Sequence, residues 1–187
     1  MTAVVPTVAV LVGSIRPSSN TAKATAVLAD ELAVLGVRTD VIDPRDLDLR
    51  LPGSEGSDEI VSQVTADLRA RVVAAAGVVL VTPEYDGSYS AVLKLLLEYL
   101  GYPSVLAGKP VALLGLASGQ IGATRALEHL RAVCLHVGAL ALPGAHSVAA
   151  VHKVFDAAGQ VKDAAMEQGI RAVARELVGF VQKVGPA

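Results

Sequence analysis

The chain has 187 residues, a formal net charge of −2 and an aromatic content of 3%, a balance that argues against a nucleic-acid surface, which would be basic and often aromatic. Hydrophobic residues make up 52% of it, but the apolar runs are short, whereas a membrane-spanning helix needs about 20 continuous apolar residues. We therefore expect one domain over residues 1–187 that has no membrane segment and binds a small molecule.

Strand-like apolar runs alternate with stretches of helical periodicity along the chain. This alternation is typical of a parallel sheet with helices on both faces. Strands are expected at 8–12, 37–42, 77–81 and 110–116, and a last one near Leu140 is interrupted by Pro143 and Gly144. The first helix, between the first two strands, has Leu28, Leu32 and Leu35 on one stripe, and the second runs through Ile60, Val64, Leu68 and Val72. The later helices are expected at about 90–100, at about 123–137 and from Met166 to Val181. Five strand–helix units of this kind predict an α/β sandwich with three layers.

The first strand runs into the segment VLVGSIRPSSNT, from Val10 to Thr21. A loop that feeds a helix N-terminus offers free backbone N–H groups and the positive end of the helix dipole, which together suit a phosphate. Four hydroxyls and one guanidinium add further donors, from Ser14, Ser18, Ser19, Thr21 and Arg16. The segment has neither the GK[ST] ending of a Walker A loop nor the three spaced glycines of a dinucleotide fingerprint. The alternative is that Ser19 or Asn20 merely caps the helix.

Two more loops follow strands of the same sheet. TPEYDGSYS, from Thr82 to Ser90, and ASGQIG, from Ala117 to Gly122, are both rich in Gly or polar residues. Ligands of open parallel sheets bind at the carboxyl ends of the strands, so these loops and the first one are expected to meet there. The alternatives are a rigid turn in which Ser90 caps the next helix, and an ordinary strand-to-helix turn.

GSIRPSS, TPEYDGSYSAVLK and ASGQIG together resemble the NAD(P)H-dependent FMN reductases and the quinone or azo-dye reductases of flavodoxin-like fold. The resemblance implies a five-stranded parallel sheet of order 2-1-3-4-5. It also implies that the FMN phosphate is held by Ser14, Arg16, Ser19, Asn20 and Thr21. The isoalloxazine ring would lie between one wall formed by Pro83, Glu84, Tyr85, Asp86, Gly87 and Ser88 and another formed by Ser118 and Gly119.

The implied activity is hydride transfer from NADPH or NADH to FMN, followed by reduction of a small acceptor in a ping-pong cycle. Free FMN, a quinone, an azo compound or a metal oxyanion are the candidate acceptors. No side chain is expected to act as a catalytic acid or base, because the flavin carries the chemistry. A flavodoxin-type electron carrier, or a flavin-binding sensor without NAD(P)H turnover, are the alternative functions. Carriers are generally strongly acidic with aromatics at the flavin, and this chain has no Trp and a near-neutral charge.

Asp86 departs from the family pattern, which usually has Asn at this place. A deprotonated Asp only accepts hydrogen bonds, whereas Asn also donates. We expect FMN binding to persist through the backbone amide and the redox potential of the flavin to be lowered if the carboxylate lies near the ring.

The remaining expectations concern redox, metals, location and assembly. Cys134 is the only cysteine and is expected to be a buried, inert thiol. The four histidines lack the carboxylate and cysteine neighbours of a metal site, so no metal is expected. The first residues lack a basic leader, which favours a cytoplasmic protein. The resemblance implies a homodimer or homotetramer, and the apolar stripe of the 90–100 helix could pair subunits or pack on its own sheet.

Overall fold

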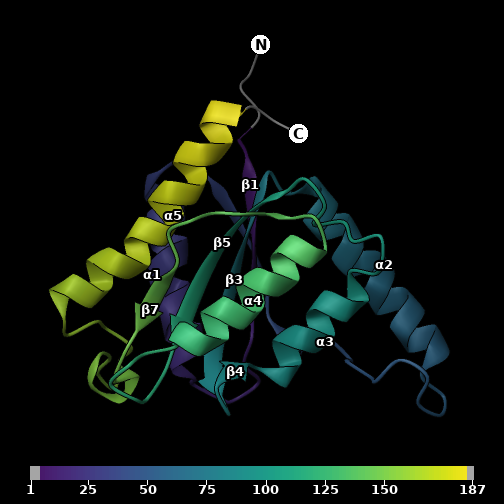
Figure 1. Cartoon of the computed structure of the whole chain (residues 1–187), viewed down its shortest axis with the longest axis horizontal. Coiled ribbons are helices and arrows are strands. Elements are labelled where there is room, and N and C mark those ends of the chain that lie inside the picture. Colours follow the sequence, from purple (N-terminus) through teal and green to yellow (C-terminus); the bar gives the residue numbers. More distant parts are fainter. Residues whose placement is uncertain (1–4, 185–187) are drawn as a thin grey trace.

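The computed structural model describes residues 5–184. Its centre is a parallel sheet in which the long strands lie in the order β2-β1-β3-β5, and β6 and β7 both pair with the outer side of β5 (Figure 1). The strands are β1 (Thr7–Val12), β2 (Arg38–Ile42), β3 (Gly77–Tyr85), β4 (Ser88–Tyr89), β5 (Pro110–Leu116), β6 (Leu140–Ala141) and β7 (His146–Val148). With β6 and β7 counted as one interrupted strand, this is the predicted order, and the flavodoxin-like fold class is confirmed.

Helices cover both faces of the sheet. They are α1 (Asn20–Val34), α2 (Asp58–Ala74), α3 (Ala91–Tyr99), α4 (Thr124–His136) and α5 (Ala164–Val184), with short 3-10 turns η1 (Pro44–Asp46) and η2 (Val151–Lys153). One apolar cluster joins the sheet to α1 and α5. The other joins it to α2, α3 and α4, so the three predicted layers are present.

The central strands are apolar on both sides because both of their faces are covered. Along β1, Val8 and Val10 belong to the α1–α5 cluster, and Ala9 and Leu11 belong to the opposite one. The edge strand β2 keeps exposed and half-buried positions over most of its length. This matches its alternating sequence and its prediction as an edge.

The prediction of five strands was wrong, since the sheet has seven. The last expected strand is split into β6 and β7 because Pro143 has no N–H to donate to a ladder. The second extra strand is β4, which pairs antiparallel with the end of β3 and places Tyr85 opposite Ser88. Asp86 and Gly87 form the two-residue turn between them, both with positive φ. Asp-Gly is a strong signal for such a hairpin, so the residues from Thr82 to Tyr85 extend the strand instead of forming the expected loop.

The apolar stripe of α3 faces the sheet. Leu93, Leu96 and Leu100 have no exposed surface, and Tyr99 is buried, with its hydroxyl accepting a hydrogen bond from the Arg50 amide and donating one to the Arg50 carbonyl. Leu96 and Leu100 of the predicted stripe are therefore core contacts, and Val92 is half-buried at its edge.

Candidate functional site

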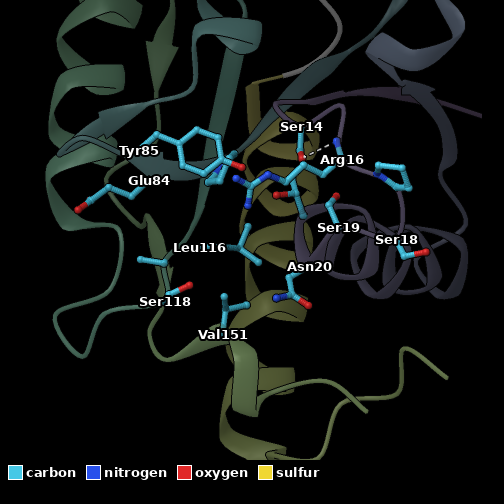
Figure 2. Close-up of a pocket in the computed structure, with 14 residues that line it drawn as sticks. Ser14, Arg16, Ser18, Ser19, Asn20, Glu84, Tyr85, Leu116, Ser118 and Val151 are labelled. Atoms are coloured by element: carbon cyan, nitrogen blue, oxygen red, sulfur yellow. Dashed lines mark hydrogen bonds between the residues drawn. The ribbon is translucent and has the colours of Figure 1, made fainter. Parts of the chain in front are cut away.

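One cavity of about 270 Å³ opens at the carboxyl ends of β1, β3 and β5 (Figure 2). Its lining combines the three loops that the sequence singles out with one segment from further along the chain. The lining residues are Ser14, Arg16, Pro17, Ser18, Ser19, Asn20, Thr21, Pro83, Glu84, Tyr85, Leu116, Ala117, Ser118 and Val151.

The loop after β1 is held tightly against the neighbouring strand and helix. The Gly13 amide donates to the Val81 carbonyl over 2.7 Å, and the Ser90 hydroxyl donates to the Gly13 carbonyl over 2.7 Å. A Cβ at Gly13 would lie 2.8 Å from the Val81 oxygen, so a side chain there would force the strands apart. Ser90 also caps α3 by accepting from the Leu93 amide. The expected cap is thus present together with a contact to the first loop.

The N-terminus of α1 forms one end of the cavity. Ser19 is its N-cap and accepts a hydrogen bond from the Ala22 amide over 3.1 Å. The amides of Asn20 and Thr21 lie in the first turn, where no helical carbonyl can accept from them, and neither is bonded to another residue within 5–184. Ser14 and Thr21 place nearly buried polar residues beside these amides, with 4% and 3% of their surface exposed. The arrangement offers several donors and a helix dipole to an anion.

The β3–β4 hairpin forms a wall at the other end. Tyr85 lies at its cavity side, and the Arg16 guanidinium is 5.2 Å from the centre of its ring (Figure 2). This is a cation–π contact between the first loop and the hairpin. Arg16 therefore lies near the ring of Tyr85 in this structure, whereas the family resemblance implies a place at the phosphate.

The third wall follows β5 and is held by the segment after β7. The Ala117 amide donates to the Val148 carbonyl, and the Val151 amide donates to the Ala117 carbonyl. Gly119 accepts from the Ala150 amide. These bonds bring Val151 to the cavity next to Asn20 (Figure 2).

The cavity gathers part of the predicted set. Ser14, Arg16, Ser19, Asn20, Thr21, Pro83, Glu84, Tyr85 and Ser118 line it, whereas Asp86, Gly87, Ser88 and Gly119 do not. Asp86 and Gly87 form the hairpin turn, and the Ser88 hydroxyl is 3.1 Å from Nδ1 of His129 on α4.

Ser18, named above only among the hydroxyls of the first loop, also lines the cavity. Four lining residues were not named as site candidates: Pro17, Leu116, Ala117 and Val151. Pro17 stands inside the GSIRPSS motif, and Leu116 and Ala117 stand where β5 ends, so position along the chain could have indicated them. Val151 follows no motif and reaches the cavity only through tertiary hydrogen bonds.

Other reactive side chains lie elsewhere. Cys134 lies on the buried face of α4, and burial raises the pKa of its thiol to about 11, consistent with the expected inert thiol. Among residues 5–184, no three His, Cys, Asp or Glu side chains are placed to hold a metal ion. In the same part of the chain, no helix is both long and apolar enough to cross a membrane.

Comparison with known proteins decides the family. A family model described as NADPH-dependent FMN reductase matches residues 6–153. The chain belongs to this family. It is therefore a flavin-dependent oxidoreductase that uses FMN and NAD(P)H.

Individual members of the family and solved structures agree with this assignment. The chain is 35% identical over 133 residues to a 2-hydroxy-1,4-benzoquinone reductase of a Burkholderia species, covering 70% of each protein. It is 32% identical over 134 residues to the NADH:(hydroxy)cinnamate reductase subunit CrdA of Vibrio ruber, an alignment that covers 70% of this chain and 66% of that protein. The structure of FerB, a flavoenzyme NAD(P)H:(acceptor) oxidoreductase from Paracoccus denitrificans, superposes with a TM-score of 0.78 at 27% identity, covering 96% of this chain and 98% of that one.

Proposed function

We propose that this FMN reductase holds FMN in the cavity of Figure 2, with the phosphate at the N-terminus of α1 and the isoalloxazine ring beside the β3–β4 hairpin. The observation that carries the proposal is the pair of unbonded amides at Asn20 and Thr21 beside the nearly buried residues Ser14 and Thr21. Such convergent donors fit a phosphate dianion. The opposite end offers the Tyr85 ring and Pro83, which fit a flat heterocycle.

When bound, FMN accepts hydride from the nicotinamide and passes the electrons to the second substrate. The protein positions and shields the reacting groups. Ser19 and the α1 amides would hold the phosphate. Pro83 and Tyr85 would line one side of the ring, and Ala117 and Ser118 would line the other. Arg16 offers a positive charge near the Tyr85 ring, which favours anionic or oxygen-rich groups at that end of the cavity.

The acceptor is proposed to be a small quinone-like or azo compound that occupies the same opening as the nicotinamide in turn. The benzoquinone reductase among the relatives supports this class of acceptor. One opening at the sheet edge serves both substrates, so we propose a ping-pong order. Initial rates at several fixed quinone concentrations would then give parallel double-reciprocal lines.

The test is an anaerobic visible spectrum of the protein reconstituted with FMN, taken before and after NADPH and then after benzoquinone. We expect NADPH to bleach the bound flavin and benzoquinone to restore it. Flavin that stays oxidised under NADPH would indicate a carrier or sensor.

Riboflavin, which lacks the phosphate, should bind at least about tenfold more weakly than FMN, since charge-assisted hydrogen bonds contribute about 1.5–3 kcal/mol each. Equal affinities would contradict the proposed orientation.

We also propose a homodimer or homotetramer that pairs through the outer surface of α3 and α4. A groove of about 320 Å³ lies there, lined by Lys94, Leu97, Glu98, Gly101, Tyr102, Val133, His136 and Val137. Tyr102 is 81% exposed, and its ring stacks on that of His136. Lys94 and Glu98 form an ion pair with each other along α3, so the groove presents no unpaired charge from these two residues to a second copy of the same surface.

A further inference from the structure

Helix α4 has no N-terminal cap of its own. Its N-cap position is Ala123, whose methyl side chain cannot accept a hydrogen bond. Four amides at a helix N-terminus lack helical acceptors, and a capping side chain normally satisfies one or two of them. The helix begins directly after the loop that forms the third wall of the cavity, so its first turn lies close to the site.

Two side chains from other elements supply the missing acceptors. Oε2 of Glu84, at the end of β3, accepts a hydrogen bond from the Ala126 amide over 3.1 Å. Oγ of Ser147, on β7, accepts from the Ala123 amide over 2.8 Å. Figure 2 shows the Glu84 carboxylate directed away from Asn20 and Ser19, although the residue lines the cavity. A carboxylate at a helix N-terminus is stabilised further by the helix dipole.

These two residues come from the elements that flank the cavity on either side of the third wall. Glu84 is next to Tyr85 in the hairpin, and Ser147 precedes the Val148 carbonyl that accepts from the Ala117 amide. The hairpin has further contacts with the same helix, through Ser88 with His129 and through Gly87, where a Cβ would lie 3.5 Å from Cδ of Arg125. The first turns of α4 thus contact the β3–β4 hairpin and β7, and they follow directly on the third wall of the cavity.

We infer that Glu84 and Ser147 are positioning residues, which cap α4 from the two flanking strands and thereby fix the distance between the hairpin wall and the third wall of the cavity. Neither needs to touch the reacting atoms. The inference rests on the proposed placement of FMN, because it concerns the walls on either side of the ring. In this arrangement the Glu84 carboxylate faces the N-terminus of α4, while the Arg16 guanidinium lies over the Tyr85 ring.

The test compares Glu84→Ala, Glu84→Gln and Ser147→Ala with the wild type. Capping substitutions of this kind cost about 0.5–2 kcal/mol, which corresponds to about a 2- to 30-fold change if the loss appears in binding. We expect Glu84→Ala and Ser147→Ala to weaken FMN binding by such a factor and to raise KM for benzoquinone more than they lower kcat. Glu84→Gln should recover most of the affinity, because its amide oxygen can still accept from Ala126.

A readout without flavin makes the contact itself visible. In the apo protein the Ala126 amide should exchange its hydrogen faster in Glu84→Ala than in the wild type, and the Ala123 amide should do so in Ser147→Ala. Glu128→Gln, the same charge change at an exposed position of α4, is the matched control and should change neither exchange nor affinity.

The outcomes separate this inference from the proposed function. If the wild type does not bind FMN, the proposed placement of FMN fails. If the wild type binds FMN, and the Ala variants expose the amides yet keep its affinity and KM for benzoquinone, the caps serve only the stability of α4 and the inference is wrong. Unchanged amide exchange in the Ala variants would also overturn it.

Discussion

Ser19 shows how one side chain can serve both the fold and the ligand. Its hydroxyl accepts from the Ala22 amide and caps α1, while its place at the cavity puts it beside the proposed phosphate. The two readings that the sequence left open, a helix cap and a phosphate ligand, are therefore compatible. They differ in what they predict for binding.

Ser19→Ala is expected to lower the free energy of unfolding by about 1 kcal/mol through loss of the cap. It should also weaken FMN binding while leaving riboflavin binding unchanged, because only FMN has the phosphate. Urea denaturation and fluorescence titration with both flavins would measure the two effects. Ser62→Ala, at an exposed position of α2, is the control. If FMN and riboflavin lose affinity equally, Ser19 acts through the helix alone.

Asp86 occupies a turn position with φ of 50°, where Asn and Asp are better tolerated than other non-glycine residues. Asp86→Asn should therefore keep the hairpin and FMN binding. It removes a negative charge close to the ring end of the cavity, so we expect the midpoint potential of bound FMN to rise. Spectroelectrochemical titration of both proteins would measure it, and an unchanged potential would show that the carboxylate does not affect the flavin.

At the scale of elements, strong local patterns explain what the sequence could predict. The alternating apolar runs indicated the long strands and the helices, since β1, β3 and β5 are buried on both faces. The Asp86–Gly87 pair contained enough signal for the hairpin, but the many Pro, Gly and polar residues between Thr82 and Ser90 made the segment look like a loop. The contacts of Glu84 and Ser147 with α4, and the place of Val151 at the cavity, could not be predicted from pattern, because the partners are distant in sequence and meet only in the folded chain.

His146 joins β7 to α5. Its ring lies against Gly169 of α5, where no space remains for a side chain. Its Nε2 is buried without a partner among the described residues. Burial lowers the pKa of this histidine from its usual value of 6.5. The docked position of α5 therefore favours the neutral imidazole.

The consequence is a stability that depends on pH. Below about 6.5 the unfolded chain binds a proton at His146 that the folded chain takes up only at lower pH, so the free energy of unfolding falls as pH drops through this value. Denaturant titrations between pH 5 and 7.5, a window set by the usual histidine value of about 6.5, would show the slope. His146→Gln should flatten it.

Glu31 provides the internal check on that slope. Its hydrogen bond with Arg175, together with that from Arg171, holds the pKa of this carboxyl below its usual value of 4.5. Its contribution to stability is complete above 4.5 and is lost only as pH falls below that value. A slope near 6.5 that survives in His146→Gln would assign the effect to another group and contradict the prediction.

For the whole molecule, the arrangement of apolar surface separates core from interface. The stripe of α3 that the sequence offered for subunit pairing is largely buried on the sheet, so the proposed pairing surface is the outer groove, where Tyr102 is exposed. Tyr102→Glu should reduce the mass of the proposed dimer or tetramer, because a charge would be buried in the paired groove without a partner. Sedimentation velocity would measure the mass of each form. Leu51→Glu, a similar substitution at an exposed loop position, should leave the assembly intact. A monomeric wild type, or a Tyr102→Glu variant with unchanged mass, would show that this surface does not pair subunits.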